Sequence, residues 1–157
     1  MPILQIHVAI SLLAIASGIF VIAGLITDRY LNGWTAFCLL FTVLTSLTGF
    51  LLPLHGLDPP VVVAIVSLVV LAIAIVSLYS RRLQGGWRSL YIVTLMIALY
   101  LNVFVLIAQM FNKLPAFKPY ENEPLFQTVQ GVVLLLFVIL TVVAIKKFHP
   151  NLRAKLG

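Results

Sequence analysis

A metal site is one chemistry that this sequence allows. Two imidazoles and a carboxylate are ligands that zinc, iron and copper accept, and His7, His55 and Glu123 offer such a set. A b-type haem held by His7 and His55 is a related option, but it requires both histidines on facing helices, and His55 follows Pro53, beyond the predicted helix. The three residues come from separate segments, so no ligand spacing supports a metal or a haem. The alternative is that His7 packs inside the fold and His55 lies in a wet turn.

Neutral amides form the second group of candidates. Asn102 and Gln109 are spaced to share one face of a helix, and Gln127 and Gln130 lie close together in a later apolar stretch. Such amides either hydrogen-bond a neighbouring helix, for about 0.6–2 kcal/mol each, or line a pocket for a quinone, a lipid or another amphiphile. The candidate pocket residues are His7, Asn102, Gln109, Gln127 and Gln130, with His55 and Glu123 at the mouth.

Five apolar stretches must position these residues. They cover approximately residues 3–27, 34–53, 61–80, 88–112 and 126–146. Each has the roughly 20 residues that a helix needs to cross a bilayer. The chain is 62% hydrophobic and 9% charged, against about 25% charged residues in a soluble domain. The sequence therefore predicts an all-α membrane protein, a single transmembrane domain over residues 1–157 with five membrane-spanning helices.

The basic residues predict the orientation of that bundle. If the five stretches alternate across the membrane, eight of the ten Lys and Arg residues fall on one side: Arg29, Arg81, Arg82, Arg88, Lys146, Lys147, Arg153 and Lys155. By the positive-inside rule this side is cytoplasmic, which places the N-terminus outside and the C-terminus in the cytoplasm. The candidate pocket residues then gather toward the outer leaflet, with Asn102 roughly 15 Å deeper than Asn112 at 1.5 Å per residue.

Small and polar residues predict which helix faces turn inward, because helices in lipid associate through close packing and polar contacts. The predicted inward residues are His7, Ser11, Ala14 and Gly18; Thr42, Thr45, Ser46 and Gly49; Ser67, Ala74 and Ser77; Tyr91, Thr94, Ala98, Asn102, Gln109 and Lys113; and Gln127, Gln130, Gly131, Leu134 and Thr141. The only cysteine, Cys38, is expected to be a small buried apolar residue.

Four segments carry a resemblance to known proteins. They are Trp34-Thr35-Ala36, Thr45-Ser46-Leu47-Thr48-Gly49-Phe50, Leu99-Tyr100-Leu101-Asn102-Val103-Phe104-Val105 and Glu123-Pro124-Leu125-Phe126. They resemble a group of small, functionally uncharacterised bacterial multi-pass inner-membrane proteins, which implies a bacterial inner membrane. The resemblance brings no activity and no site residues.

The distribution of charge excludes several functions. No predicted span has a charged residue in its central part, whereas ion-coupled transporters and proton pumps usually need one there. The basic residues flank helix ends, which argues against nucleic acid as a partner. No catalytic motif is present, and an enzyme is therefore not favoured. The cofactor, if any, is not specified.

Three functions stay open. The favoured hypothesis is an accessory or interaction subunit of the inner membrane, in contact with other membrane-protein subunits or in a homo-oligomer. The alternative is a binding or redox protein with a polar pocket at the outer leaflet for a quinone, lipid, haem or metal. An oligomeric channel or carrier is the second alternative.

Overall fold

The computed structural model describes residues 2–52, 58–120 and 124–150, and these form α-helices joined by short turns. The helices are α1 (Pro2–Ile26), α2 (Asn32–Gly49), α3 (Pro59–Ile75), α4 (Gly86–Lys113) and α5 (Pro124–Lys147). A π-helical turn, η1 (Val76–Ser80), continues α3, and a 3-10 turn, η2 (Lys118–Tyr120), follows α4. The described part of the chain thus confirms the predicted all-α fold.

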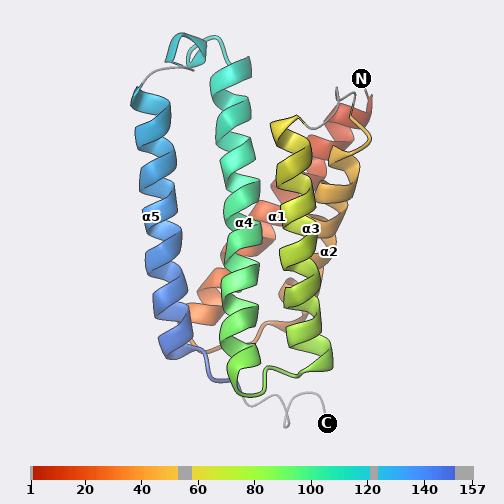
Figure 1. Cartoon of the computed structure of the whole chain (residues 1–157), viewed down its shortest axis with the longest axis vertical. Helices are drawn as coiled ribbons and strands as arrows, with labels where there is room; N and C mark the ends of the chain where they lie inside the picture. The colour runs from red at the N-terminus through yellow and green to blue at the C-terminus, as the bar shows by residue number, and fades with distance from the viewer. Residues whose placement is uncertain (1, 53–57, 121–123, 151–157) are drawn as a thin grey trace.

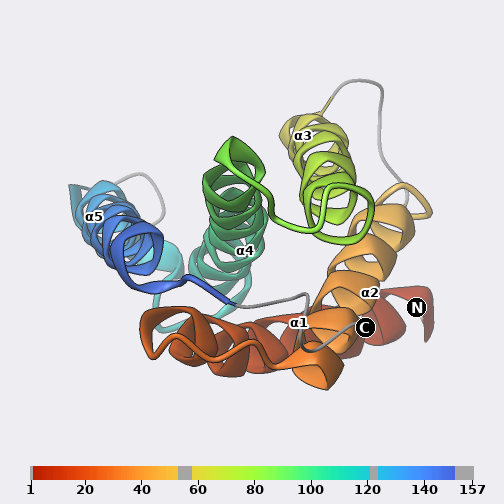
Figure 2. The same cartoon turned by 90° about the horizontal axis from the view of Figure 1, so that it is seen from below.

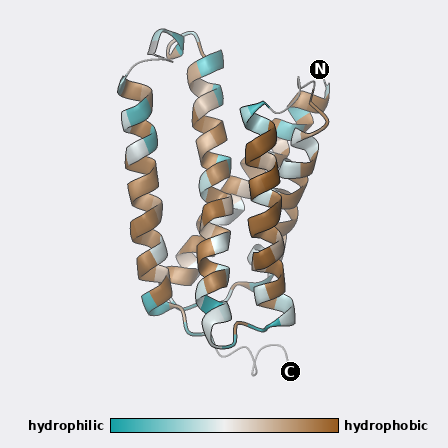
Figure 3. Ribbon diagram, in the orientation of Figure 1, coloured by the Kyte–Doolittle hydropathy of each residue, from teal (hydrophilic) through white to brown (hydrophobic). Residues whose placement is uncertain are grey.

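Four of these helical segments are long and apolar enough to cross a membrane: α1, α3 with η1, α4 and α5. In Figure 3 these segments are coloured mainly as hydrophobic residues, with hydrophilic residues most frequent near the helix ends. The chain is therefore a multi-pass helical membrane protein. Helix α2 has 18 residues, which corresponds to about 27 Å, and it is not among the four. Its crossing of the membrane stays a prediction.

The boundaries of α2 differ from the predicted stretch 34–53. Asn32 and Gly33 lie in the first turn of the helix rather than before it. The α-helix ends at Gly49, because the next three N–H groups bond to carbonyls three residues back, beginning with Phe50 to Leu47 at 3.2 Å. Similarly, α3 begins at Pro59, with Asp58 in extended conformation at its N-cap position. Prolines suit this first turn because its N–H groups need no helical partner.

The helices α2, α3, α4 and α5 stand side by side in chain order, and α1 runs obliquely across one face of this row (Figures 1 and 2). Helix α1 packs most extensively on α2 and also reaches α4 and α5. We call the end with Pro2, Gly49, Pro59 and Lys113 the amino end of the bundle, and the opposite end, with Ile26 and Lys147, the carboxyl end.

Most of the predicted inward residues of α2, α3 and α4 are buried, whereas Gln109 and Lys113 near the end of α4 are exposed. Thr42, Thr45 and Ser46 of α2, Ser67, Ala74 and Ser77 of α3, and Tyr91, Thr94, Ala98 and Asn102 of α4 are all buried. Cys38 is fully buried, as predicted. Gly18 of α1 lies against α4, where a Cβ would come within 2.7 Å of Leu99 Cδ2. A glycine there lets α1 cross α4 closely.

The inward face of α5 is narrower than predicted. Gln127, Gly131 and Leu134 are exposed, so their assignment to the inward face is wrong. The buried residues of α5 are Gln130, Phe137 and Ala144, which recur every seven residues. This single stripe arises because α5 lies at the end of the row, where it contacts α4 and only part of α1.

The carboxyl end is held by contacts between segments far apart in the sequence. After α1 the chain turns at Asp28, whose φ is 56°, and the Arg29 N–H bonds to the Gly24 carbonyl at 2.8 Å. A Cβ on Gly24 would lie 2.6 Å from the Arg29 carbonyl oxygen, so this turn requires glycine there. The Asp28 carboxylate accepts the His149 N–H at 2.8 Å, which ties the segment after α5 to this turn.

Two further residues fasten α5 at this end. The guanidinium of Arg88, in the first turn of α4, donates from Nη1 to the carbonyls of Ile145 and Phe148, both at 2.7 Å. The Phe148 side chain is fully buried among the core residues. Arg88 therefore caps α5, and Phe148 fills the carboxyl end of the bundle.

Candidate functional site

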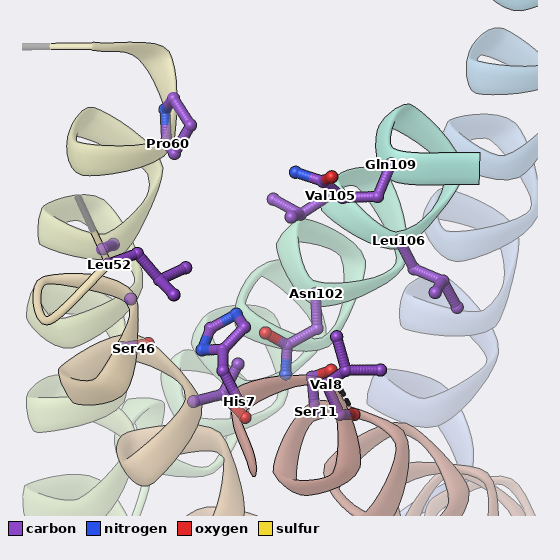
Figure 4. A pocket seen from close by; sticks show the side chains of 13 residues that line it. His7, Val8, Ser11, Ser46, Leu52, Pro60, Asn102, Val105, Leu106 and Gln109 are labelled. Atoms are coloured by element: carbon purple, nitrogen blue, oxygen red, sulfur yellow. Dashed lines mark hydrogen bonds between the residues drawn. The ribbon is translucent and has the colours of Figure 1, made fainter. Parts of the chain in front are cut away.

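A cavity of about 110 Å³ lies at the amino end between α1, α2, α3 and α4. Its apolar walls include Val8, Leu52, Pro60, Ala64, Val105 and Leu106. Its polar residues are His7, Ser11, Thr45, Ser46, Asn102 and Gln109. Figure 4 shows Pro60 and Gln109 flanking the upper part of the cavity, and both residues are exposed. The cavity is therefore mainly apolar with a few polar groups, which is the usual character of a small-molecule site.

His7 is fixed by one hydrogen bond to α2. Its Nδ1 lies 2.8 Å from the Thr48 hydroxyl oxygen, and that hydroxyl lies 2.8 Å from the Leu44 carbonyl. A hydroxyl has one proton, and the carbonyl can only accept it. His7 must therefore donate its Nδ1–H to Thr48, which leaves Nε2 as a hydrogen-bond acceptor in the neutral ring.

Asn102 supplies a hydrogen-bond donor. Its side chain is only 8% exposed, and its Nδ2 has no hydrogen-bond partner among the residues that the structure describes. Figure 4 shows the Asn102 amide and the His7 ring on neighbouring sides of the same cavity. A buried amide donor without a partner costs roughly 1–3 kcal/mol, so a ligand atom that accepts its hydrogen bond would be stabilised.

The hydroxyl groups that line the cavity have no proton left to donate to a ligand. Ser11 donates to the Val8 carbonyl at 2.8 Å, Thr45 to the Phe41 carbonyl at 2.8 Å and Ser46 to the Thr42 carbonyl at 3.1 Å. Each of these protons is used within its own helix. Among the described residues that line the cavity, Asn102 is therefore the one with a buried side-chain donor that lacks a partner.

The structure brings together three of the five candidate pocket residues, namely His7, Asn102 and Gln109. Gln127 is exposed on α5. Gln130 is buried and donates from Nε2 to the Phe104 carbonyl of α4 at 3.1 Å, which is the interhelical contact expected of an amide outside a pocket. Neither lines the cavity.

The proposed metal ligands His55 and Glu123 lie outside the described residues. Within the ranges 2–52, 58–120 and 124–150, no group of three or more His, Cys, Asp or Glu residues could hold a metal ion. The metal and haem hypotheses therefore gain no support from the described residues.

Sequence reasoning missed Thr48 as the partner of His7. Thr48 adjoins the predicted inward face of α2 but does not belong to it, and its distance of 41 residues from His7 hides the contact. The available signal was topological: α1 and α2 form an antiparallel pair, so the start of one meets the end of the other. The apolar wall residues Ala64 and Val105 carry no signal beyond helical periodicity.

No protein-family model, curated protein or solved structure matches the chain. The resemblance to small bacterial inner-membrane proteins therefore stays a prediction. What the structure supports is a small multi-pass membrane protein with four long apolar helices.

Proposed function

We propose that this protein is a membrane-embedded binding protein whose cavity receives the polar headgroup of an amphiphile. The observation that carries the proposal is Asn102, which lines the cavity, is more than nine-tenths buried and has no partner for its Nδ2 among the described residues. The apolar walls beside it suit the part of an amphiphile next to its headgroup. Both features are typical of a small-molecule pocket.

The orientation proposed from the sequence places this cavity toward the outer leaflet. Six of the eight basic residues assigned to the cytoplasmic side are described, and they lie at or beside the carboxyl end: Arg29, Arg81, Arg82, Arg88, Lys146 and Lys147. Lys113 and Lys118 lie at the amino end with the cavity. This asymmetry supports a cytoplasmic carboxyl end. We propose the bacterial inner membrane, following the resemblance.

Filling the cavity tests the function. A Cβ on Gly49 would lie 3.8 Å from His7 Cε1 and 3.9 Å from the Ala64 Cβ, which are ordinary contacts. Gly49→Leu therefore adds its first carbon without a clash and extends the rest into the cavity. We expect the amount of amphiphile retained per protein after extraction in mild detergent, measured by mass spectrometry, to fall at least about tenfold.

Gly131→Leu is the matched control. Gly131 is exposed on α5, and a Cβ there would meet nothing within 4 Å. This variant makes the same substitution in a helix that does not line the cavity and should retain the wild-type amount. Equal retention in both variants, or no stoichiometric amphiphile in the wild type, would contradict the proposed function.

An accessory or interaction subunit is the second candidate, and α5 is the observation that favours it. Only one stripe of α5 is buried, and residues on its other sides, such as Val132 and Leu135, are about three-fifths exposed, at 61% and 60%. Lipid or another membrane subunit can cover these sides. Purification in mild detergent separates the cases: a monomer that brings no protein partner would count against the subunit hypothesis.

A further inference from the structure

Two side chains that line the cavity, Asn102 and His7, carry one hydrogen-bond donor and one acceptor between them. Asn102 Nδ2 is the donor, and the bond from His7 to Thr48 leaves His7 Nε2 as the acceptor. A ligand that satisfies both groups must itself both accept and donate. An ester or ketone oxygen accepts from Asn102 but gives nothing to His7, whereas a hydroxyl group does both.

Charge narrows the ligand further. No charged side chain is found among the described residues that line the cavity. A carboxylate, phosphate or ammonium group taken out of water without a paired charge is strongly disfavoured. Lys113 is exposed and does not line the cavity. The headgroup that fits is neutral.

The size of the cavity sets a limit on what is buried. A dry cavity of about 150 Å³ is known to hold a benzene ring, and this one measures about 110 Å³. It accommodates a hydroxyl and the few carbons that carry it. The rest of the ligand must extend out of the cavity, either between the exposed Pro60 and Gln109 or along the exposed Val8.

Building on the proposed function, we infer that the bound amphiphile is a neutral alcohol or phenol. Its hydroxyl oxygen accepts from Asn102 Nδ2, and its hydroxyl hydrogen is donated to Nε2 of His7. Two membrane-soluble compounds share this chemistry, a long-tailed quinol and a diacylglycerol, and a comparison of their binding separates them.

The test compares each alcohol with its methyl ether, which still accepts a hydrogen bond but cannot donate one. Dissociation constants are measured in detergent micelles for decylbenzoquinol and its dimethyl ether, and for dioctanoylglycerol and its methyl ether. We expect at least one of the two alcohols to bind about five- to tenfold more tightly than its ether, which is the effect of one neutral hydrogen bond. The alcohol that shows this preference identifies the bound amphiphile as a quinol or as a diacylglycerol.

Two substitutions assign the two bonds. In His7→Asn the amide nitrogen can replace Nδ1 as the donor to Thr48, while the acceptor at Nε2 is removed, so the alcohol should lose its advantage over the ether. Asn102→Leu removes the donor and should weaken both compounds about five- to tenfold. Gln130→Leu is the control, since it removes a buried amide that lies outside the cavity. Thermal unfolding of each variant shows whether it is folded.

The outcomes separate this inference from the proposed function. If the wild type retains an amphiphile but neither alcohol binds better than its ether, the hydroxyl assignment is overturned and the binding function stands. The hydroxyl assignment is also overturned if folded His7→Asn keeps the full preference for the alcohol. If the wild type retains nothing and binds no probe, the binding function itself fails.

Discussion

Replacing Phe148 with alanine is expected to lower the free energy of unfolding by about 3–5 kcal/mol, the range for removing a buried phenylalanine side chain. Phe148 follows α5, yet its ring is fully buried in the core at the carboxyl end. The backbone there is fixed by the Phe148 N–H to the Ala144 carbonyl at 2.8 Å and by the bond from His149 to Asp28. The structure can therefore close the resulting cavity only partly. Unfolding in mixed dodecylmaltoside and SDS micelles measures the effect.

Phe50→Ala is the matched control for this prediction. Phe50 follows α2, as Phe148 follows α5, but its side chain is 40% exposed. The loss of this side chain should lower the free energy of unfolding by less than about 1 kcal/mol, as is usual for substitutions at exposed positions. Equal destabilisation by the two substitutions would show that Phe148 does not support the core in the way described.

The second large effect is expected from Arg88→Met, at about 3 kcal/mol. The substitution keeps a long apolar side chain but removes both hydrogen bonds to the last carbonyls of α5. Hydrogen bonds from a charged group contribute about 1.5–3 kcal/mol each, and a positive charge at a helix C-terminus is favourable by itself. Hydrogen exchange adds a local measurement, because the amides near Ala144 and Phe148 should exchange faster than those in the middle of α5.

Arg82→Met controls for the loss of a positive charge at the same end. Arg82 is exposed in the turn before α4, so its replacement should change the free energy of unfolding by less than about 0.5 kcal/mol. The destabilisation by Arg88→Lys should lie between those of Arg88→Met and Arg82→Met, since lysine keeps the charge but lacks the planar group that reaches two carbonyls. If Arg88→Met and Arg82→Met unfold alike, the cap contributes nothing.

Apolar stretches and small-residue periodicity predicted much of this fold. They placed Ala98 and Asn102 on the buried face of α4, and depth along the helices put His7, Asn102 and Gln109 near the same end of the bundle. Those predictions depend on one helix at a time, and the local rules of helix geometry are sufficient for them.

The position of α5 around the bundle could not be predicted in this way. Gln130 lies near the start of α5, toward the amino end of the bundle, but α5 stands at the edge of the row of helices (Figure 2). Its amide therefore turns to the Phe104 carbonyl rather than to the cavity. The roles of Arg88 and Phe148 were missed for a similar reason, because each depends on a contact with a segment that periodicity does not place.

The polar inner face of α2 has a consequence for how the chain enters the membrane. Its buried Thr35, Thr42, Thr45 and Ser46 would face hydrocarbon if this short helix were released into lipid alone. Helix α1 offers by far the largest surface against which it packs. We therefore expect the two to leave the translocon together as a helical hairpin. In a ribosome-bound chain that stops before α2 is complete, α1 should still be held at the translocon.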